Sequence, residues 1–122
     1  MLEKLEEAIE LDPEEAMYYF IYGLFLLRFR KFDKAYTQFI ISQEIETLEY
    51  RKNISSLWMA RSLDLAGKRR KAIDKYKEII DVSENIYEDI KTKARHGLKQ
   101  VYTMENLKRS NIFMPFADVI ES

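Results

Sequence analysis

The spacing of apolar residues predicts helices along most of the chain. Leu2, Leu5 and Ile9 fall on one helix face, and the pattern ends at Asp12 and Pro13, where a proline suits the first turn of a following helix. Helical spacing recurs in five later segments, at about residues 14–29, 32–45, 55–65, 71–80 and 86–103. Three glycines and two prolines in 122 residues favour helices joined by short turns over a turn-rich sheet. We therefore expect an all-α chain whose successive helices are antiparallel.

The segment 17–27 is apolar around the whole helix and carries no charge. It is about half as long as the roughly 20 residues that a helix needs to cross a bilayer. The first residues, MLEKLEEAIELD, are acidic and lack the basic start of a signal peptide. We therefore expect a soluble, cytoplasmic protein with no membrane insertion. A helix that is apolar all round is normally buried on every side, so this segment needs cover from the chain or from a partner.

A motif of small and aromatic residues repeats along the chain. Ala35 and Phe39 recur 37 positions later as Ala72 and Tyr76. The motifs that precede these pairs are Tyr19-x2-Tyr22-Gly23-x2-Leu26 and Ser56-x2-Met59-Ala60-x2-Leu63. A period near 34 residues with two helices per unit resembles the tetratricopeptide repeat, whose pattern is W-x2-L-G-x2-Y followed by A-x3-F. The resemblance covers about residues 1–80, and the second unit is the more degenerate.

The resemblance implies antiparallel helix-turn-helix repeats stacked as a short right-handed α-solenoid. It divides the chain into a repeat domain over residues 1–110 and an apolar C-terminal tail over residues 111–122. The parts of the repeat domain that it implies are a partial first repeat (1–13), two repeats (14–47 and 50–82) and a capping helix (86–103).

In tetratricopeptide arrays the first helix of each repeat lines the concave surface, so the resemblance implies a groove of mostly apolar side chains. The groove residues that it implies are Met17, Phe20, Leu24, Leu27 and Arg28, then Ile54, Leu57, Arg61, Asp64 and Leu65. Family members that grip the carboxyl terminus of a peptide use lysine, asparagine and arginine at several of these positions. Phe20 and Leu24 occupy such positions here, so a carboxylate clamp is not expected.

Residues able to carry catalysis or to hold a metal are few in this sequence. There is no cysteine, which excludes disulfides and thiolate ligands. The single histidine, His96, has no second histidine or patterned acid near it to complete a metal shell or a proton relay. Phosphate-cradling glycine loops and the H-E-x-x-H and G-x-S-x-G motifs do not occur. We expect a protein that is not an enzyme, and we assign no catalytic residue, cofactor or metal site.

Charge is balanced overall, with 20 lysines and arginines against 21 aspartates and glutamates. Two basic clusters, within residues 28–34 and 68–71, fall at the turns inside the two repeats, so stacking would place them along one edge of the array. Turns of helical proteins are usually charged, so we interpret this edge as solvated surface and expect no specific nucleic-acid partner. An RNA-binding helical repeat that uses this edge is a second alternative.

These observations favour a non-enzymatic protein–protein interaction or scaffold module with an apolar concave groove. The first alternative is an accessory or regulatory domain of a larger enzyme or membrane-associated protein. The tail NIFMPFADVIES is apolar, with Phe113, Met114 and Phe116 around Pro115, and we expect it to dock on apolar surface. The groove would then hold a protein or peptide partner, the chain's own tail, or a second copy in a homodimer.

Overall fold

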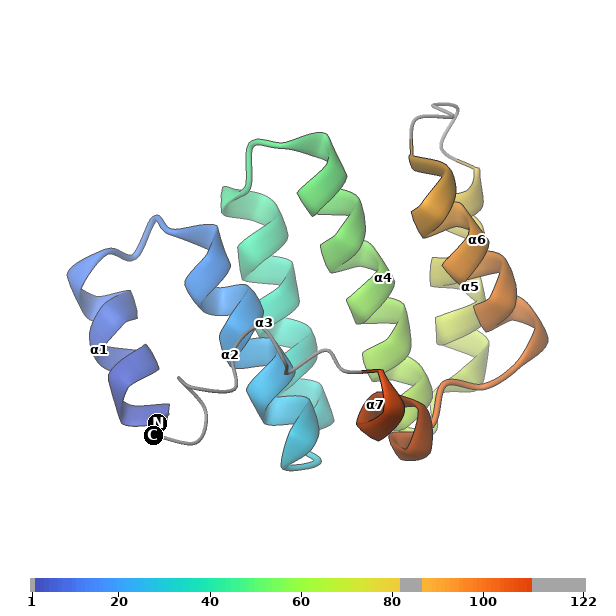
Figure 1. Ribbon diagram of the computed structural model, residues 1–122, viewed down its shortest axis with the longest axis horizontal. Coiled ribbons are helices and arrows are strands. Elements are labelled where there is room, and N and C mark those ends of the chain that lie inside the picture. The colour runs from blue at the N-terminus through green and yellow to red at the C-terminus, as the bar shows by residue number, and fades with distance from the viewer. Residues whose placement is uncertain (1, 82–86, 111–122) are drawn as a thin grey trace.

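The computed structural model describes residues 2–81 and 87–110, and within these ranges the protein consists of α-helices without a strand (Figure 1). The helices are α1 (Leu2–Leu11), α2 (Ala16–Arg28), α3 (Phe32–Ile45), α4 (Glu49–Leu65), α5 (Arg69–Ile80), α6 (Glu88–Lys99) and α7 (Met104–Arg109). The predicted all-α class is confirmed. None of the described helices is long and apolar enough to cross a membrane. The predicted docking tail, with Phe113, Met114 and Phe116, lies outside the described residues.

The first six helices are arranged as neighbours in chain order. Each packs against the helix that follows it, and α4 also contacts α6. In Figure 1 they stand side by side in a row, from α1 at one end to α5 and α6 at the other. The short helix α7 departs from this order, because its side chains reach the core formed by α2, α3 and α4.

The turns that close the α2–α3 and α4–α5 hairpins share one backbone structure. Arg30 (φ 61°) and Gly67 (φ 79°) both lie in the left-handed region. In each turn the next backbone N–H donates to a carbonyl five residues back, Lys31 to Leu26 at 2.9 Å and Lys68 to Leu63 at 2.8 Å. This is the Schellman motif, which ends a helix by satisfying its last carbonyl groups. The two hairpins are therefore closed in equivalent ways.

Two apolar cores, joined by α4, hold the helices together. In the first core, a Cβ on Gly23 would lie 2.6 Å from Cε1 of Phe39, so α2 and α3 approach too closely for a side chain there. The second core has the same kind of contact between α5 and α6, where Gly97 lies against the ring of Tyr76. The buried residues are Leu24, Leu26, Leu27, Ala35, Phe39, Trp58, Met59 and Leu107 in the first core and Leu57, Ala60, Ala72, Tyr76, Ile79, Ile90 and Ala94 in the second.

α2 and α5 differ from their predicted bounds by one or two residues at an end, and α4 and α6 differ more. α4 begins at Glu49 rather than near Ser55, because the Glu46 carboxylate accepts hydrogen bonds from the next two backbone N–H groups and directs the chain into the helix. The capping helix predicted over residues 86–103 is shorter, since α6 ends at Lys99 and the backbone after it is extended. The separate helix α7 follows, and it was not predicted.

Candidate interaction surface

The apolar groove residues implied by the sequence lie in two different environments. Met17 and Phe20 on α2 are half-buried and line a pocket that faces α4. Leu24, Leu27 and Leu57 are at most 3% exposed and belong to the cores, so they offer no open surface. The apolar helix α2 is thus covered largely by the rest of the chain. Its accessible apolar surface is concentrated near its N-terminal half.

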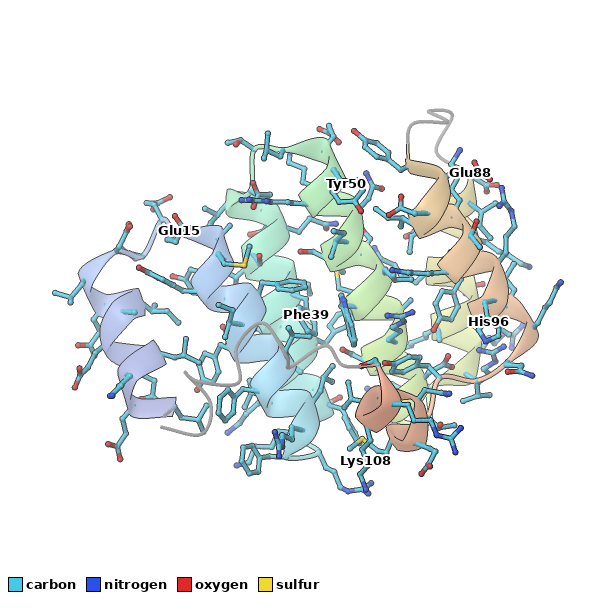
Figure 2. The ribbon with its side chains drawn as sticks, viewed as in Figure 1. Glu15, Phe39, Tyr50, Glu88, His96 and Lys108 are labelled. Carbon is cyan, nitrogen blue, oxygen red and sulfur yellow. The ribbon has the colours of Figure 1, made fainter. Side chains whose placement is uncertain are left out.

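A pocket of about 160 Å³ lies at the junction of α2, α3 and α4. Its lining residues are Met17 and Phe20 of α2, Ser42 and Glu46 at the end of α3 and its cap, and Tyr50, Arg51, Ile54 and Ser55 of α4. Tyr50 marks the start of α4 in Figure 2. At the rim, Nη1 of Arg51 lies 3.9 Å from Oε2 of Glu46. The pocket therefore combines an apolar lining with one charged pair.

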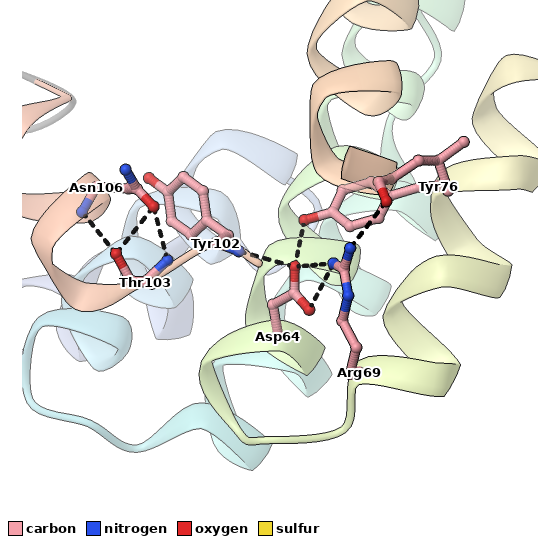
Figure 3. Close-up of polar contacts among 7 residues, drawn as sticks. Asp64, Arg69, Tyr76, Tyr102, Thr103 and Asn106 are labelled. Carbon is pink, nitrogen blue, oxygen red and sulfur yellow. Dashed lines mark hydrogen bonds and ion pairs between the residues drawn. The ribbon is translucent and has the colours of Figure 1, made fainter. Parts of the chain in front are cut away.

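Asp64, which the sequence implied as a groove residue, is instead the centre of a buried hydrogen-bond cluster (Figure 3). Its side chain is 0% exposed. Nη1 of Arg69 donates to both carboxylate oxygens, at 3.1 and 3.0 Å. The hydroxyl of Tyr76 and the backbone N–H of Tyr102 each donate to Oδ2 at 3.0 Å. Arg69 also donates to the carbonyl of Leu98 at 3.1 Å, so this one carboxylate ties α4, α5, α6 and the segment before α7 together.

The cluster changes the protonation behaviour of Tyr76. Burial, and then the neighbouring Asp64 carboxylate, raise the pKa of this phenol well above its usual value. Tyr76 therefore remains a hydrogen-bond donor to Asp64 across the physiological pH range. The arrangement is a structural clamp, because one buried carboxylate accepts hydrogen bonds from three separate parts of the chain.

Arg61, a second implied groove residue, lies between two aromatic rings one turn before Asp64. Its Cζ is 4.8 Å from the ring centroid of Trp58 and 4.5 Å from that of Tyr102. The two rings meet edge to face, with centroids 5.9 Å apart. Both cation–π contacts restrain the plane of the guanidinium. Arg28, the third charged residue implied in the groove, is exposed at the end of α2.

Arg61 also lines a small pocket of about 80 Å³ between α4, α5, α6 and the start of α7. The other lining residues are Tyr76, Lys93, His96, Gly97, Gln100, Val101, Tyr102 and Asn106. His96, interpreted from the sequence as a surface histidine, is exposed on α6 (Figure 2). The pocket lies on the side of α4 that faces α6.

Residues 102–107 pack on the first core, to which α2, α3 and α4 contribute. Leu107 is 2% exposed within the first core, and Tyr102 and Met104 pack against that core. A reciprocal capping box starts α7: Oγ1 of Thr103 accepts from the backbone N–H of Asn106, whose side chain accepts from the Thr103 N–H at 2.9 Å. The chain itself therefore covers part of the surface that a partner was expected to cover.

Residues of both basic clusters lie side by side where the two hairpin turns meet. The residues that line a shared depression there are Arg30, Lys31, Lys34 and Lys68, together with Phe32, Asp33 and Ala66. Nζ of Lys68 lies 3.3 Å from Oδ1 of Asp33, which links the two hairpin turns. Arg69 is directed inward to Asp64. Part of the positive charge of this edge is therefore paired within the chain.

Among the described residues, no group of three or more His, Cys, Asp or Glu side chains is placed to hold a metal ion. In comparisons of this chain with protein-family models, curated proteins and solved structures, nothing matches. The candidate surface is therefore defined by geometry alone. It consists of the apolar pocket between α2 and α4 and of the small polar pocket beside Arg61, further along α4.

Proposed function

We propose that this protein is a non-enzymatic interaction module, built like a short right-handed tetratricopeptide array, that binds a peptide segment of a partner protein. The observation that carries the proposal is the pocket of about 160 Å³ between α2 and α4. Met17, Phe20 and Ile54 present apolar surface there, and no side chain within the described ranges fills it. Concave apolar pockets with a few polar groups are where proteins most often bind ligands.

The equivalence of the two hairpins supports the tetratricopeptide-like part of the proposal. Both hairpins end their first helix in a Schellman motif, with Arg30 and Gly67 at matching positions. Ala35 and Ala72 are both 0% exposed where the second helix of each hairpin packs. Small residues at these positions let the helices approach closely, which is the physical basis of the family's pattern.

The pocket suits one apolar side chain of a peptide. Burying such a side chain contributes about 1.5–3 kcal/mol, which is too little for stable binding alone. Further contacts must come from the peptide backbone, for which the half-exposed side chain of Arg51 offers a donor. We therefore expect a short linear segment with one apolar anchor as the partner.

Peptide selection from a random displayed library on the purified full chain tests this function. We expect the selected peptides to share one apolar position and to bind saturably. Ile54→Gln should weaken their Kd by about tenfold, because it places a polar group in the apolar lining. Leu11→Gln is the matched control, since Leu11 is 87% exposed on α1 and lies outside the pocket. Selection that yields no saturable binder, or binders equally affected by both substitutions, would contradict the proposal.

A further inference from the structure

The guanidinium of Arg61 has hydrogen-bonding capacity that no other residue in the described part of the chain uses. Within residues 2–81 and 87–110, Arg61 makes cation–π contacts with Trp58 and Tyr102 but no hydrogen bond or ion pair. The nearest buried carboxylate, Asp64, is engaged by Arg69 through both oxygens. Burial lowers the pKa of Arg61, which shows that its charge is incompletely solvated. A guanidinium with five N–H donors in this position is prepared for an anionic ligand.

Two further nitrogen-bearing side chains line the same pocket. Lys93 and His96 project from the exposed side of α6, while Arg61 approaches from α4. Gln100 and Asn106 add amide groups, and none of the described residues that line the pocket is acidic. Its volume of about 80 Å³ is several times the roughly 10–15 Å³ that suffices for one water molecule, so a carboxylate or phosphate group has room. Arg61, Lys93 and His96 bring nitrogen donors to a lining in which none of the described residues is a carboxylate, and this favours an anionic ligand.

We infer that this pocket is an oxyanion subsite for a bound peptide, and that it takes an acidic or phosphorylated side chain. The inference rests on the proposed function, because the same peptide would place its apolar anchor between α2 and α4. Ile54 of the apolar pocket and Arg61 of the small pocket lie on one helix, seven positions apart. That separation is two turns, or about 10 Å along α4. About three residues of an extended peptide span this distance.

Carboxylate and phosphate share the chemistry that the subsite recognises. An arginine fork accepts either group in a bidentate geometry. A phosphate carries nearly two negative charges, so it would also engage Lys93 and His96, whereas a carboxylate is satisfied by fewer donors. Removing Lys93 and His96 of α6 should therefore weaken the binding of phosphate more than that of carboxylate.

The first experiment tests the subsite alone, with phosphate and acetate added to the full chain at constant ionic strength. NMR follows the His96 ring in wild type and in Arg61→Gln, and the Arg61 Nε–H in wild type and in the double variant Lys93→Gln/His96→Gln. We expect saturable shifts in the wild type. The apparent Kd of phosphate should be at least about tenfold weaker in both variants, and that of acetate should be weaker in Arg61→Gln. Arg70→Gln, at an exposed arginine of α5, should match the wild type. Because Lys93 and His96 are exposed, the double variant retains the fold even if Arg61→Gln does not.

No saturable shift with either anion in the wild type, or Kd values that Arg61→Gln leaves unchanged, overturns the subsite. A phosphate Kd that is unchanged in the double variant removes Lys93 and His96 from it. The second experiment uses peptides selected on the apolar pocket, synthesised with glutamate, phosphoserine or glutamine three positions from the anchor. We expect the glutamate or phosphoserine peptide to bind about tenfold more tightly than the glutamine peptide, and Arg61→Gln to remove that advantage. A larger gain for phosphoserine, lost in the double variant, identifies phosphate as the natural group. A gain for glutamate that survives the double variant identifies a carboxylate.

The two proposals fail in different ways. Equal affinity for the three peptides overturns the oxyanion subsite and leaves the apolar pocket in place. Phosphate or acetate binding without any selectable peptide supports the anion site and overturns peptide binding as its purpose.

Discussion

Gly97 of α6 lies against the ring of Tyr76 in α5, so that a Cβ at position 97 would be 2.5 Å from both Cε1 and Cζ of that ring. The ring has little freedom to withdraw, because it is buried and its hydroxyl donates to Asp64 at 3.0 Å. The absence of a side chain at Gly97 therefore sets the distance between α5 and α6.

Gly97→Ala should lower the free energy of unfolding by about 1–3 kcal/mol, because the added methyl overpacks the contact with Tyr76. Urea unfolding followed by circular dichroism measures this loss. Lys99→Ala, at an exposed position of the same helix, should stay within about 0.5 kcal/mol of the wild type. In a Tyr76→Leu background the cost of Gly97→Ala should shrink. An unchanged cost there would show that the ring is not the obstacle.

Asp64→Ala should cost about 3–5 kcal/mol, because it leaves Arg69 without its carboxylate and removes acceptors from Tyr76 and Tyr102. Thermal and urea unfolding both report this loss. Asp74→Ala is the control, since Asp74 is exposed on α5 and should change stability little. A stability close to the wild type for Asp64→Ala would mean that the cluster is dispensable.

The stability of the protein should fall in alkaline solution because of Tyr76. Burial and Asp64 raise the pKa of this phenol in the folded chain, whereas an unfolded tyrosine ionises near pH 10. The stability that Tyr76 contributes is therefore fully present below about pH 10 and is lost as the pH rises further. Tyr76→Phe should reduce the loss of unfolding free energy between pH 9 and pH 11, measured in urea. A decline as steep as in the wild type would assign the alkaline sensitivity to other groups.

Substitutions at Arg30 and Gly67 should change the stability in opposite directions, because both residues adopt left-handed backbone angles. Glycine suits these angles, and other residues are strained by them. Gly67→Ala should lower the free energy of unfolding by about 1–2 kcal/mol through backbone strain alone, since no atom lies within 4 Å of the added Cβ. Arg30→Gly should raise it by up to about 1 kcal/mol, because relief of that strain exceeds the entropic cost of a glycine. Melting temperatures of the two variants give the signs directly, and equal signs would refute the shared turn structure.

Leu107→Ala should lower the free energy of unfolding by about 2–5 kcal/mol, because Leu107 is 2% exposed in the first core. Loosening of α7 should also increase binding of an apolar dye. Lys108→Ala, at the exposed neighbouring position, should do neither. If Leu107→Ala changes neither stability nor dye binding, α7 does not contribute to covering α2.

Most of the helices could be predicted from the sequence, because helix formation follows local spacing. The segment 32–45 matches α3 at both ends, and Pro13 marks the break between α1 and α2. α7 was missed, although Thr103 and Asn106 form a capping pair three positions apart. A helix of one to two turns carries too few apolar positions for its period to be seen. The extended backbone at Gln100 could likewise not be predicted, because neither neighbouring residue is a proline or a glycine.

The candidate surface was harder to predict, because it depends on which residues the fold brings together. Asp64 has the local pattern of an exposed residue on a charged helix. Its burial results from Arg69, Tyr76 and Tyr102, which come from three different parts of the chain. Met17 remains partly accessible, since its position near the helix start leaves it beside the pocket. Leu24, by contrast, is covered by residues whose contact with α2 has no local signal.

The attachment of α7 has a consequence for how the molecule opens. Helices that pack only on their chain neighbours can fray one after another from the ends of a row, with amide protection falling outward. Leu107 instead places the last described helix in the core that residues of α2, α3 and α4 form, so distant parts of the chain share one core. Amide hydrogens of α2, α4 and α7 should then exchange with deuterium as one cooperative unit. Among the described helices, α1 packs extensively on α2 only. Its amide hydrogens should therefore exchange earlier than those of the other helices and independently of them.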